Sequence, residues 1–248
     1  MGNRIFITAR DINVLNLVYD YERVGLDQIQ RAFFTSRSAC QKRILELTRA
    51  KLLYANPLPP RVFRGTGIMV YELGTAGRRL LGIGGRVNKV TSRFMLDHHL
   101  AECDFRWSLT KSAQSRGIIL KEWITDRQLK KNPLRVLGKP VVADGAFWLL
   151  DGERSYYYFV EIDMDQEHQG AIKLKLANYL KLDDCPIVLW VVPSERRKAH
   201  VLDWAESVAR ALGKDPKVFW VAIQGQEPLS PVWTVAGGDH GQDLIGVH

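Results

Sequence analysis

Apolar residues recur at helical spacing near the start of the chain. Ile12, Leu15 and Val18 lie three residues apart, which predicts an amphipathic helix. Thr8 can cap this helix through its hydroxyl, and Asp11 stands three residues later as the reciprocal acidic partner. The sequence therefore predicts a capped first helix that begins at Thr8.

Two further helices are predicted on either side of a polar turn at Thr35 and Ser36. The second helix is expected over 26–34 and the longer third helix over 37–50. Each has one apolar face, and the side chains expected to point inward are Leu26, Ile29, Phe33, Ile44, Leu45 and Leu47. The order of helix, short helix, polar turn and basic helix is that of a helix-turn-helix.

A β-hairpin is expected after the third helix. One strand begins in 51–54 and the other covers 68–73, while the loop between them carries Arg61 and Arg64 at its tip. A closing helix is predicted over 74–81. The phrases Arg-Ile-Leu-Glu-Leu, Lys-Leu-Leu and Tyr-Glu-Leu-Gly-Thr-Ala-Gly-Arg together resemble bacterial winged-helix proteins.

A winged helix-turn-helix implies a set of DNA contacts. The first polar residues of a helix in the major groove reach base edges, and cationic side chains on the wing meet phosphates. The expected contacts are Ser36, Arg37, Ser38, Gln41, Lys42, Arg43, Arg61 and Arg64. Arg43 is either a phosphate contact or a helix-packing residue, and a winged helix used for protein contact is the alternative for the whole domain.

The distribution of charge favours the DNA-binding interpretation. The 248-residue chain has a net charge of +8, but residues 1–90 carry 15 Lys+Arg and 6 Asp+Glu, whereas residues 91–248 carry 20 and 21. The excess of positive charge therefore lies in the first third of the chain. Such a concentration indicates a polyanionic partner, here double-stranded DNA, for which no cofactor is needed.

A glycine-rich stretch at 82–86 predicts a junction between domains. We expect a winged helix-turn-helix domain over 1–88, a second domain over 89–236 and a flexible tail over 237–248. The second domain is predicted to be a mixed α/β domain with a mixed sheet, in the order αβββαβ and followed by a further helix and strand. Its expected helices and strands cover 94–116, 118–124, 140–150, 156–163, 166–182, 186–192, 196–212 and 217–222.

This order, and three acidic residues within it, resembles the PD-(D/E)XK nuclease superfamily. Asp144 lies in the second predicted strand, while Glu161 and Asp163 end the third, where alternate positions face the same side. Carboxylates that converge at strand ends suit a hard cation such as Mg²⁺ or Mn²⁺. The resemblance implies that these three acids bind the metal of a DNA endonuclease or nickase.

The chain departs from the nuclease pattern at the lysine. Asp163 stands two residues after the acid, where the superfamily has lysine, and Ala143 replaces the proline before Asp144. The lysine has two candidate replacements on the next helix, Lys173 and Lys175. Lys175 and Tyr179 occupy the place of the Gln-x-x-x-Tyr motif of RecB-like nucleases. An inactive nuclease-like fold, kept for dimerisation or DNA contact, is the favoured alternative, so enzymatic activity stays open.

Other candidate chemistry is sparse. His98 and His99 suggest metal binding, but adjacent helical residues point about 100° apart, so at most one of them would take part, and helix packing is the preferred interpretation. Glu102 is expected to be a solvated surface residue. The cysteines, Cys40, Cys103 and Cys185, are expected to be buried free thiols. No apolar run approaches the roughly 20 residues that cross a bilayer, so a cytoplasmic protein without a membrane partner is expected.

The combined motifs resemble the replication-relaxation family of bacterial mobile elements. The resemblance rests on the winged helix, on Leu-Asp-His-His-Leu-Ala-Glu-Cys-Asp-Phe, on Phe-Val-Glu-Ile-Asp, on Lys-Leu-Ala-Asn-Tyr and on Leu-Trp-Val-Val-Pro-Ser-Glu-Arg-Arg. It implies a homodimeric DNA-binding regulator, or an accessory factor that works with replication or transfer machinery. A metal-dependent nuclease and a protein-interaction adaptor are the alternatives.

Overall fold

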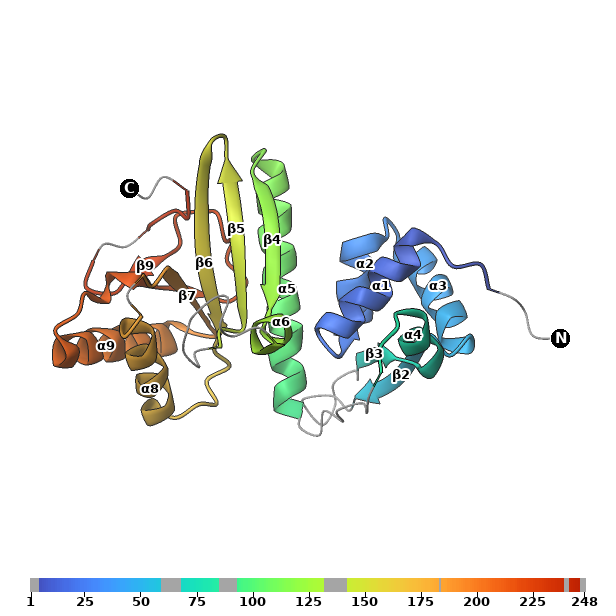
Figure 1. Cartoon of the computed structure of the whole chain (residues 1–248), viewed down its shortest axis with the longest axis horizontal. Helices are drawn as coiled ribbons and strands as arrows, with labels where there is room; N and C mark the ends of the chain where they lie inside the picture. The colour runs from blue at the N-terminus through green and yellow to red at the C-terminus, as the bar shows by residue number, and fades with distance from the viewer. Residues whose placement is uncertain are drawn as a thin grey trace. The chain divides into compact units, whose positions relative to one another are not determined.

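The chain folds into two compact units, Met1–Trp107 and Ser108–His248. The computed structural model describes residues 5–58, 68–84, 93–131, 142–182, 184–238 and 241–245 (Figure 1). Each unit has its own sheet, one with three strands and one with six. The two units are described separately below.

The first unit combines helices with a small antiparallel sheet of order β1-β3-β2. Its elements before the long helix α5 are α1 (Ala9–Asp20), β1 (Val24–Gly25), α2 (Leu26–Phe33), α3 (Arg37–Arg49), β2 (Leu53–Leu58), β3 (Ile68–Leu73) and α4 (Thr75–Leu80). The predicted helices and hairpin strands are all present within a few residues of their expected ends. The two-residue strand β1 was not predicted, because two residues carry no periodicity.

The N-termini of α1 and α3 are capped as the sequence indicates. The Thr8 side chain accepts a hydrogen bond from the Asp11 backbone, and the Asp11 carboxylate accepts one from the Thr8 N–H, which confirms the capping box. Ser36 caps α3 by accepting a hydrogen bond from the backbone N–H of Ala39. These two side-chain caps define where α1 and α3 begin.

The prediction of an inward-facing Leu45 is wrong. Cys40, Ile44 and Leu47 form the buried face of α3, whereas Leu45 is 49% exposed. One residue advances a helix by about 100°, so Leu45 cannot share the face of Ile44. Leu45 is therefore an apolar side chain on the exposed face of α3.

The second unit is built on a six-stranded mixed sheet of order β4-β5-β6-β7-β8-β9. Strands β4, β5 and β6 are antiparallel neighbours, β6, β7 and β8 are parallel, and β9 returns antiparallel to β8. The long helix α5 (Arg93–Ser115) leads into this unit. The remaining elements are β4 (Ile119–Thr125), α6 (Asp126–Lys131), β5 (Gly145–Asp151), β6 (Arg154–Ile162), α8 (Gln169–Leu180), β7 (Ile187–Val192), α9 (Glu195–Leu212) and β8 (Phe219–Ile223), followed by β9 (Thr234–Val235).

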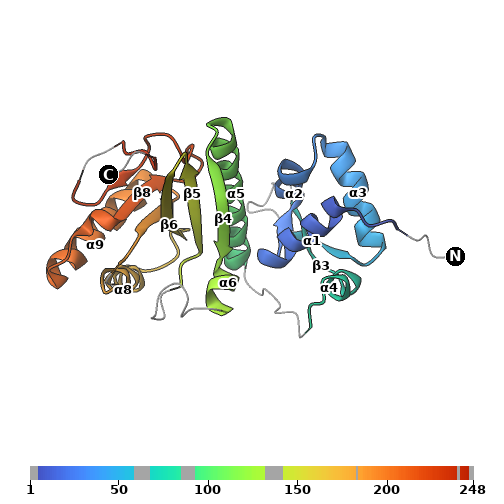
Figure 2. The ribbon, with the colours of Figure 1, turned by 45° about the horizontal axis from the view of Figure 1, so that its top comes forward.

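This architecture confirms the predicted mixed α/β class with a mixed sheet. Helices α8 and α9 pack side by side and share one core with the sheet (Figure 2). That core holds Phe159 from β6, Tyr179 from α8 and Trp204 from α9. The helix α6 and the strand β9 were not predicted, since both are short.

The division between the units differs from the expected domain boundary at residue 88. It falls after Trp107, inside α5. Cys103 belongs to the core of the first unit, and the Trp107 ring meets the Phe33 ring edge-on at 5.9 Å. The early part of α5 therefore completes the first hydrophobic core, which a glycine-rich stretch upstream does not reveal.

The expectation of a frayed tail after residue 237 also differs from the structure. Leu244 has no exposed surface, and the Tyr158 hydroxyl donates a hydrogen bond to its carbonyl oxygen. Cys40 and Cys103 are buried free thiols as expected, but Cys185 is only partly buried. Within the described residues, no helix is both long enough and apolar enough to cross a membrane.

Candidate functional site

Strand pairing brings Asp144 beside Glu161. The antiparallel register pairs Gly145 of β5 with Val160 of β6, so the residue before Gly145 lies next to the residue after Val160. The Asp144 carboxylate accepts a hydrogen bond of 2.8 Å from the Ile162 N–H. Asp144, which directly precedes β5, and Glu161 of β6 therefore meet at one end of the β5–β6 pair.

Helix α8 supplies two partners to the buried Glu161 side chain, which is 2% exposed. Lys175 Nζ lies 3.1 Å from Glu161 Oε2, and the Tyr179 hydroxyl donates to Glu161 Oε1 at 2.5 Å. Residues four apart lie on one face of a helix, which lets both side chains reach the same carboxylate. We call Asp144, Glu161, Lys175 and Tyr179 the acid–lysine cluster.

The acid–lysine cluster carries more negative than positive charge. Burial, followed by the nearby Asp144 carboxylate, raises the pKa of Glu161 to about 7, although Lys175 and Tyr179 act in the opposite direction. Burial lowers the pKa of Lys175, but Glu161, Asp144 and Glu167 outweigh burial and raise that pKa above its usual range. The Lys175 ammonium thus interacts with three carboxyl groups, those of Asp144 and Glu161 in the cluster and that of Glu167 beside it. A further cation would balance this excess of negative charge.

The structure distinguishes the two lysines that the sequence left open. Lys175 contacts Glu161 and also lies 3.1 Å from Glu167 Oε1. Lys173 instead lies 3.1 Å from the side-chain amide oxygen of Gln169. Of the two, Lys175 is the lysine that stands beside the acids.

The predicted cluster of three acids is divided, because Asp163 is engaged by Arg197. Arg197 Nε donates to Asp163 Oδ2 at 2.6 Å, and the two side chains are 6% and 2% exposed. The same guanidinium donates to the Glu167 carbonyl oxygen at 2.8 Å. Asp163 is therefore one half of a buried ion pair, and Asp144 and Glu161 remain as the pair of acids near Lys175.

Sequence reasoning missed Arg197. It directly follows the exposed Arg196 at the start of α9, and an adjacent pair of arginines gives no sign of which one is buried. Its place five residues after the end of the buried apolar strand β7 was the available signal. A cation at that place can reach an acid that ends a neighbouring strand.

The outer face of α3 carries most of the predicted DNA contacts. Arg37, Ser38, Gln41 and Lys42 are all exposed. Arg37 forms an ion pair with Asp27 of α2, and both side chains are more than half exposed. Exposed pairs of this kind stabilise a fold by less than about 1 kcal/mol, so Arg37 can exchange its partner at low cost.

Arg43, the residue with two interpretations, is a packing residue in this structure. Its guanidinium contacts the Asp11 carboxylate at 2.9 and 2.6 Å, Glu46 at 2.7 Å and the Phe6 carbonyl oxygen at 2.6 Å. Asp11 is fully buried; burial alone would raise its pKa, but Arg43 and Thr8 lower it to about 2. The pair ties α3 to the N-terminus of α1.

A groove of about 690 Å³ lies beside α3 in the first unit. Arg37, Gln41 and Leu45 line it from α3, and Ile68 and Met69 line it from β3. The groove is therefore lined by both polar and apolar side chains. Arg61 and Arg64, the predicted contacts at the tip of the hairpin, lie outside the described residues.

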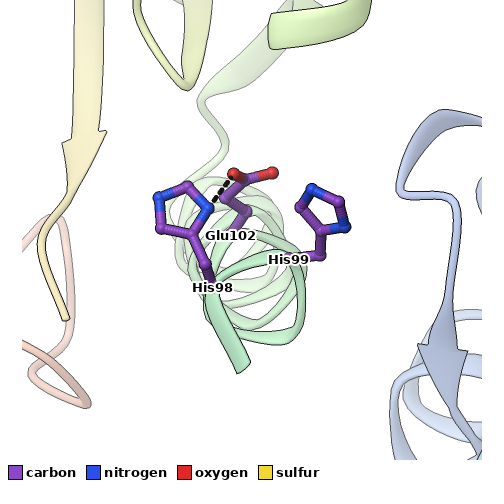
Figure 3. A group of neighbouring side chains, drawn as sticks. All are labelled: His98, His99 and Glu102. Carbon is purple, nitrogen blue, oxygen red and sulfur yellow. Dashed lines mark ion pairs between the residues drawn. The ribbon is translucent and has the colours of Figure 1, made fainter. Parts of the chain in front are cut away.

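His98, His99 and Glu102 form a second group of side chains, on α5 (Figure 3). One potential ligand atom from each of the three lies within 4.8 Å of the others. Glu102 is 4% exposed, so the prediction of a solvated surface residue is wrong. The expectation that at most one of the histidines could take part in such a group is not met either, since both rings flank the Glu102 carboxylate.

The family model described as replication-relaxation matches residues 15–184, which is well over half of the chain. The chain belongs to the replication-relaxation family. This membership confirms the resemblance seen in the sequence motifs. It suggests a role in plasmid replication or transfer.

Other comparisons add little to the family assignment of this replication-relaxation protein. A solved structure of the restriction endonuclease FokI bound to DNA is similar over 86% of the chain, with 11% sequence identity and a TM-score of 0.27. The chain spans 42% of the length of that protein. We draw no conclusion from a similarity at this TM-score. A comparison with curated protein sequences finds no match.

Proposed function

We propose that this member of the replication-relaxation family binds double-stranded DNA through the first unit, with α3 as the recognition helix of a winged helix-turn-helix. In this role it would act as a regulator or an accessory factor in the replication or transfer of a mobile element. The observation that carries the proposal is the exposed polar face of α3, formed by Arg37, Ser38, Gln41 and Lys42. A helix of this kind fits the major groove and presents hydrogen-bond donors to base edges.

The charge of the chain supports the same proposal. Residues 1–90 carry 15 Lys+Arg against 6 Asp+Glu, and residues 91–248 carry 20 against 21. A surface with this excess attracts the phosphate backbone, and each neutralised phosphate makes binding more sensitive to salt. A homodimer would place two such helices on a two-fold symmetric site.

The test combines binding-site selection with quantitative binding. DNA sequences enriched from a random pool by the full-length protein should share a motif, and fluorescence anisotropy then gives the affinity for that motif. Replacing Gln41 and Lys42 together with alanine should lower the affinity by about 100-fold, since each good base or phosphate contact contributes about 1–3 kcal/mol. Failure to enrich any motif would contradict sequence-specific binding.

The matched control is Arg79, an exposed basic residue on α4. Arg79→Ala removes a charge from the same unit without touching α3. Its affinity for the selected motif should stay within a few-fold of the unmodified protein. An equal loss in the control and in the double variant would mean that only overall charge matters, and would overturn the assignment of α3.

A second function, metal-dependent cleavage of DNA, is favoured by one observation. This chain lacks the lysine that the nuclease pattern places two residues after the acid, but α8 brings another lysine to the same carboxylate, since Lys175 Nζ lies 3.1 Å from Glu161 Oε2. Asp144 stands next to the same carboxylate through its hydrogen bond to the Ile162 N–H. Two acids and one lysine are also the side chains that PD-(D/E)XK nucleases, which the sequence resembles, use to hydrolyse phosphodiesters.

The residues of the cluster fit a hard divalent cation. Asp144 and Glu161 supply carboxylate oxygens, the ligands that Mg²⁺ prefers, and burial together with the nearby Asp144 carboxylate raises the pKa of Glu161. A bound Mg²⁺ would supply activation of a water molecule and neutralisation of the phosphate. Lys175 and Tyr179 hold the Glu161 carboxylate in place, and Lys175 offers a positive charge next to it.

Supercoiled plasmid incubated with the protein and Mg²⁺ or Mn²⁺ tests the second function. Nicking should disappear in Asp144→Asn and in Lys175→Ala. The matched control is Lys173→Ala, which changes a lysine two residues away that contacts Gln169 instead of Glu161. Nicking that survives in Asp144→Asn would show a contaminating nuclease. An inactive protein that still binds DNA would leave the first proposal in place and overturn the second.

A further inference from the structure

Three side chains that can bind a metal ion lie close together on helix α5. His98, His99 and Glu102 stand at positions i, i+1 and i+4, so Glu102 is one turn below both histidines. Figure 3 shows the two imidazole rings on either side of the Glu102 carboxylate. Because all three residues lie on one helix, the helical backbone alone brings their side chains close together.

We propose that His98, His99 and Glu102 bind one divalent transition-metal ion of the Zn²⁺ class. Two imidazoles and one carboxylate are a ligand set that holds zinc with a fourth position open to water or another donor. Imidazole nitrogen prefers zinc and its neighbours in the transition series, whereas Mg²⁺ prefers oxygen ligands. The site would therefore select a different ion from the acid–lysine cluster.

The distances are compatible with an ion in the middle of the group. Zinc binds nitrogen and oxygen at about 2.0–2.2 Å, so two of its ligand atoms lie roughly 3.4 Å apart in a tetrahedron. His98 Nδ1 lies 2.7 Å from Glu102 Oε1, and the ligand atoms of all three residues lie within 4.8 Å of one another. The required separation falls between these values, and side-chain rotations can supply the difference.

Burial adds a reason for a cation at this place. Glu102 is 4% exposed and His99 is 9% exposed. A carboxylate removed from water is costly unless a cation or strong hydrogen bonds compensate it. A cation bound by the three side chains would therefore offset the cost of burying the Glu102 carboxylate.

The experiment measures zinc binding by the full-length protein after removal of metal with a chelator. Equilibrium dialysis with metal analysis should give one Zn²⁺ per chain that a large excess of Mg²⁺ does not displace. Glu102→Gln, which keeps the shape of the side chain, should weaken binding at least 10-fold. His98→Ala and His99→Ala should each do the same, with circular dichroism used to verify that the variants fold.

Two controls make the result specific. His200→Ala removes a histidine from α9, and Asp144→Asn removes an acid from the acid–lysine cluster; neither should alter zinc binding. Co²⁺ in place of Zn²⁺ should give visible absorption bands that disappear in folded Glu102→Gln. Unchanged stoichiometry and affinity in Glu102→Gln would overturn the site, and retention of full affinity in His99→Ala would overturn the three-ligand assignment.

Discussion

Lys175 Nζ lies 3.1 Å from Glu161 Oε2, although the two residues belong to different elements, α8 and β6. In the PD-(D/E)XK nuclease pattern, which the sequence resembles, the acid and its lysine are two residues apart on one strand. Here the same pair of charges meets through helix–sheet packing. The spacing of the two residues in sequence is thus a poor guide to their spacing in the folded protein.

The raised pKa of Glu161 predicts that stability falls as the pH rises. The folded protein binds a proton at this carboxyl up to about pH 7, whereas the unfolded chain loses it at its usual pKa near 4.5. The free energy of unfolding should therefore decrease by on the order of 2 kcal/mol between pH 5 and pH 8. Glu161→Gln should lack this contribution, which thermal unfolding of both proteins across that range would measure.

A parallel loss of stability in both proteins would contradict this assignment to Glu161. Mg²⁺ provides a second measurement on the same proteins. Added Mg²⁺ should raise the melting temperature of the unmodified protein at pH 8 more than that of Glu161→Gln, because an ion that binds only the folded state stabilises it.

Substitution of two adjacent residues of α3, Lys42 and Arg43, should affect the free energy of unfolding very differently. Arg43→Ala leaves the fully buried Asp11 carboxylate without its main partner and should lower the free energy of unfolding by about 3 kcal/mol or more. Lys42→Ala changes an exposed side chain and should leave stability within about 0.5 kcal/mol. Denaturant unfolding and DNA binding measured on both variants separate the two roles. Equal destabilisation by the two substitutions would contradict the packing role of Arg43.

Asp11 predicts a loss of stability in acid. Its pKa of about 2 lies below the usual value of 3.8, so the folded state favours the ionised carboxyl. This contribution, about 2 kcal/mol, is present above pH 4 and disappears as the pH falls through 2. Asp11→Asn should be less stable than the unmodified protein at pH 6, and the difference should shrink towards pH 2. A difference that is the same at both pH values would exclude this origin.

The neighbouring arginines of α9, Arg196 and Arg197, offer a second comparison of adjacent residues. Arg197→Met leaves Asp163 buried without its cation and should cost about 3–5 kcal/mol of stability. Arg196 is 77% exposed, and Arg196→Met should change stability by less than about 0.5 kcal/mol. Thermal or denaturant unfolding would show the contrast. A mild effect of Arg197→Met would mean that Asp163 finds other compensation.

Periodicity and capping residues were sufficient to predict the main elements. The apolar spacing of the helices in the first unit and the apolar runs of the strands in the second are local properties, and local rules identify them. The short elements β1, α6 and β9 lack enough residues for a period. Leu45 was assigned to the wrong face because a cluster of apolar residues hides which of them shares the face of Ile44.

The candidate sites were predicted less completely, because they depend on which side chains meet. Lys175 and Tyr179 were found from the resemblance of their segment to the Gln-x-x-x-Tyr motif of RecB-like nucleases. Their contact with Glu161 depends on how α8 packs on the sheet, which no local pattern gives. The same holds for the pairing of Asp163 with Arg197, since 34 residues separate them along the chain.

The helix α5 also limits how this protein can be recombined with its relatives. Its residues 93–107 belong to the first unit, and Cys103 lies in that unit's core. A genetic crossover in the glycine-rich stretch at 82–86 would therefore give a chimera whose first core is completed by a foreign helix. Exchange of first units among such proteins should succeed when the donor segment extends past Trp107, and should otherwise require compatible residues at Cys103 and Trp107.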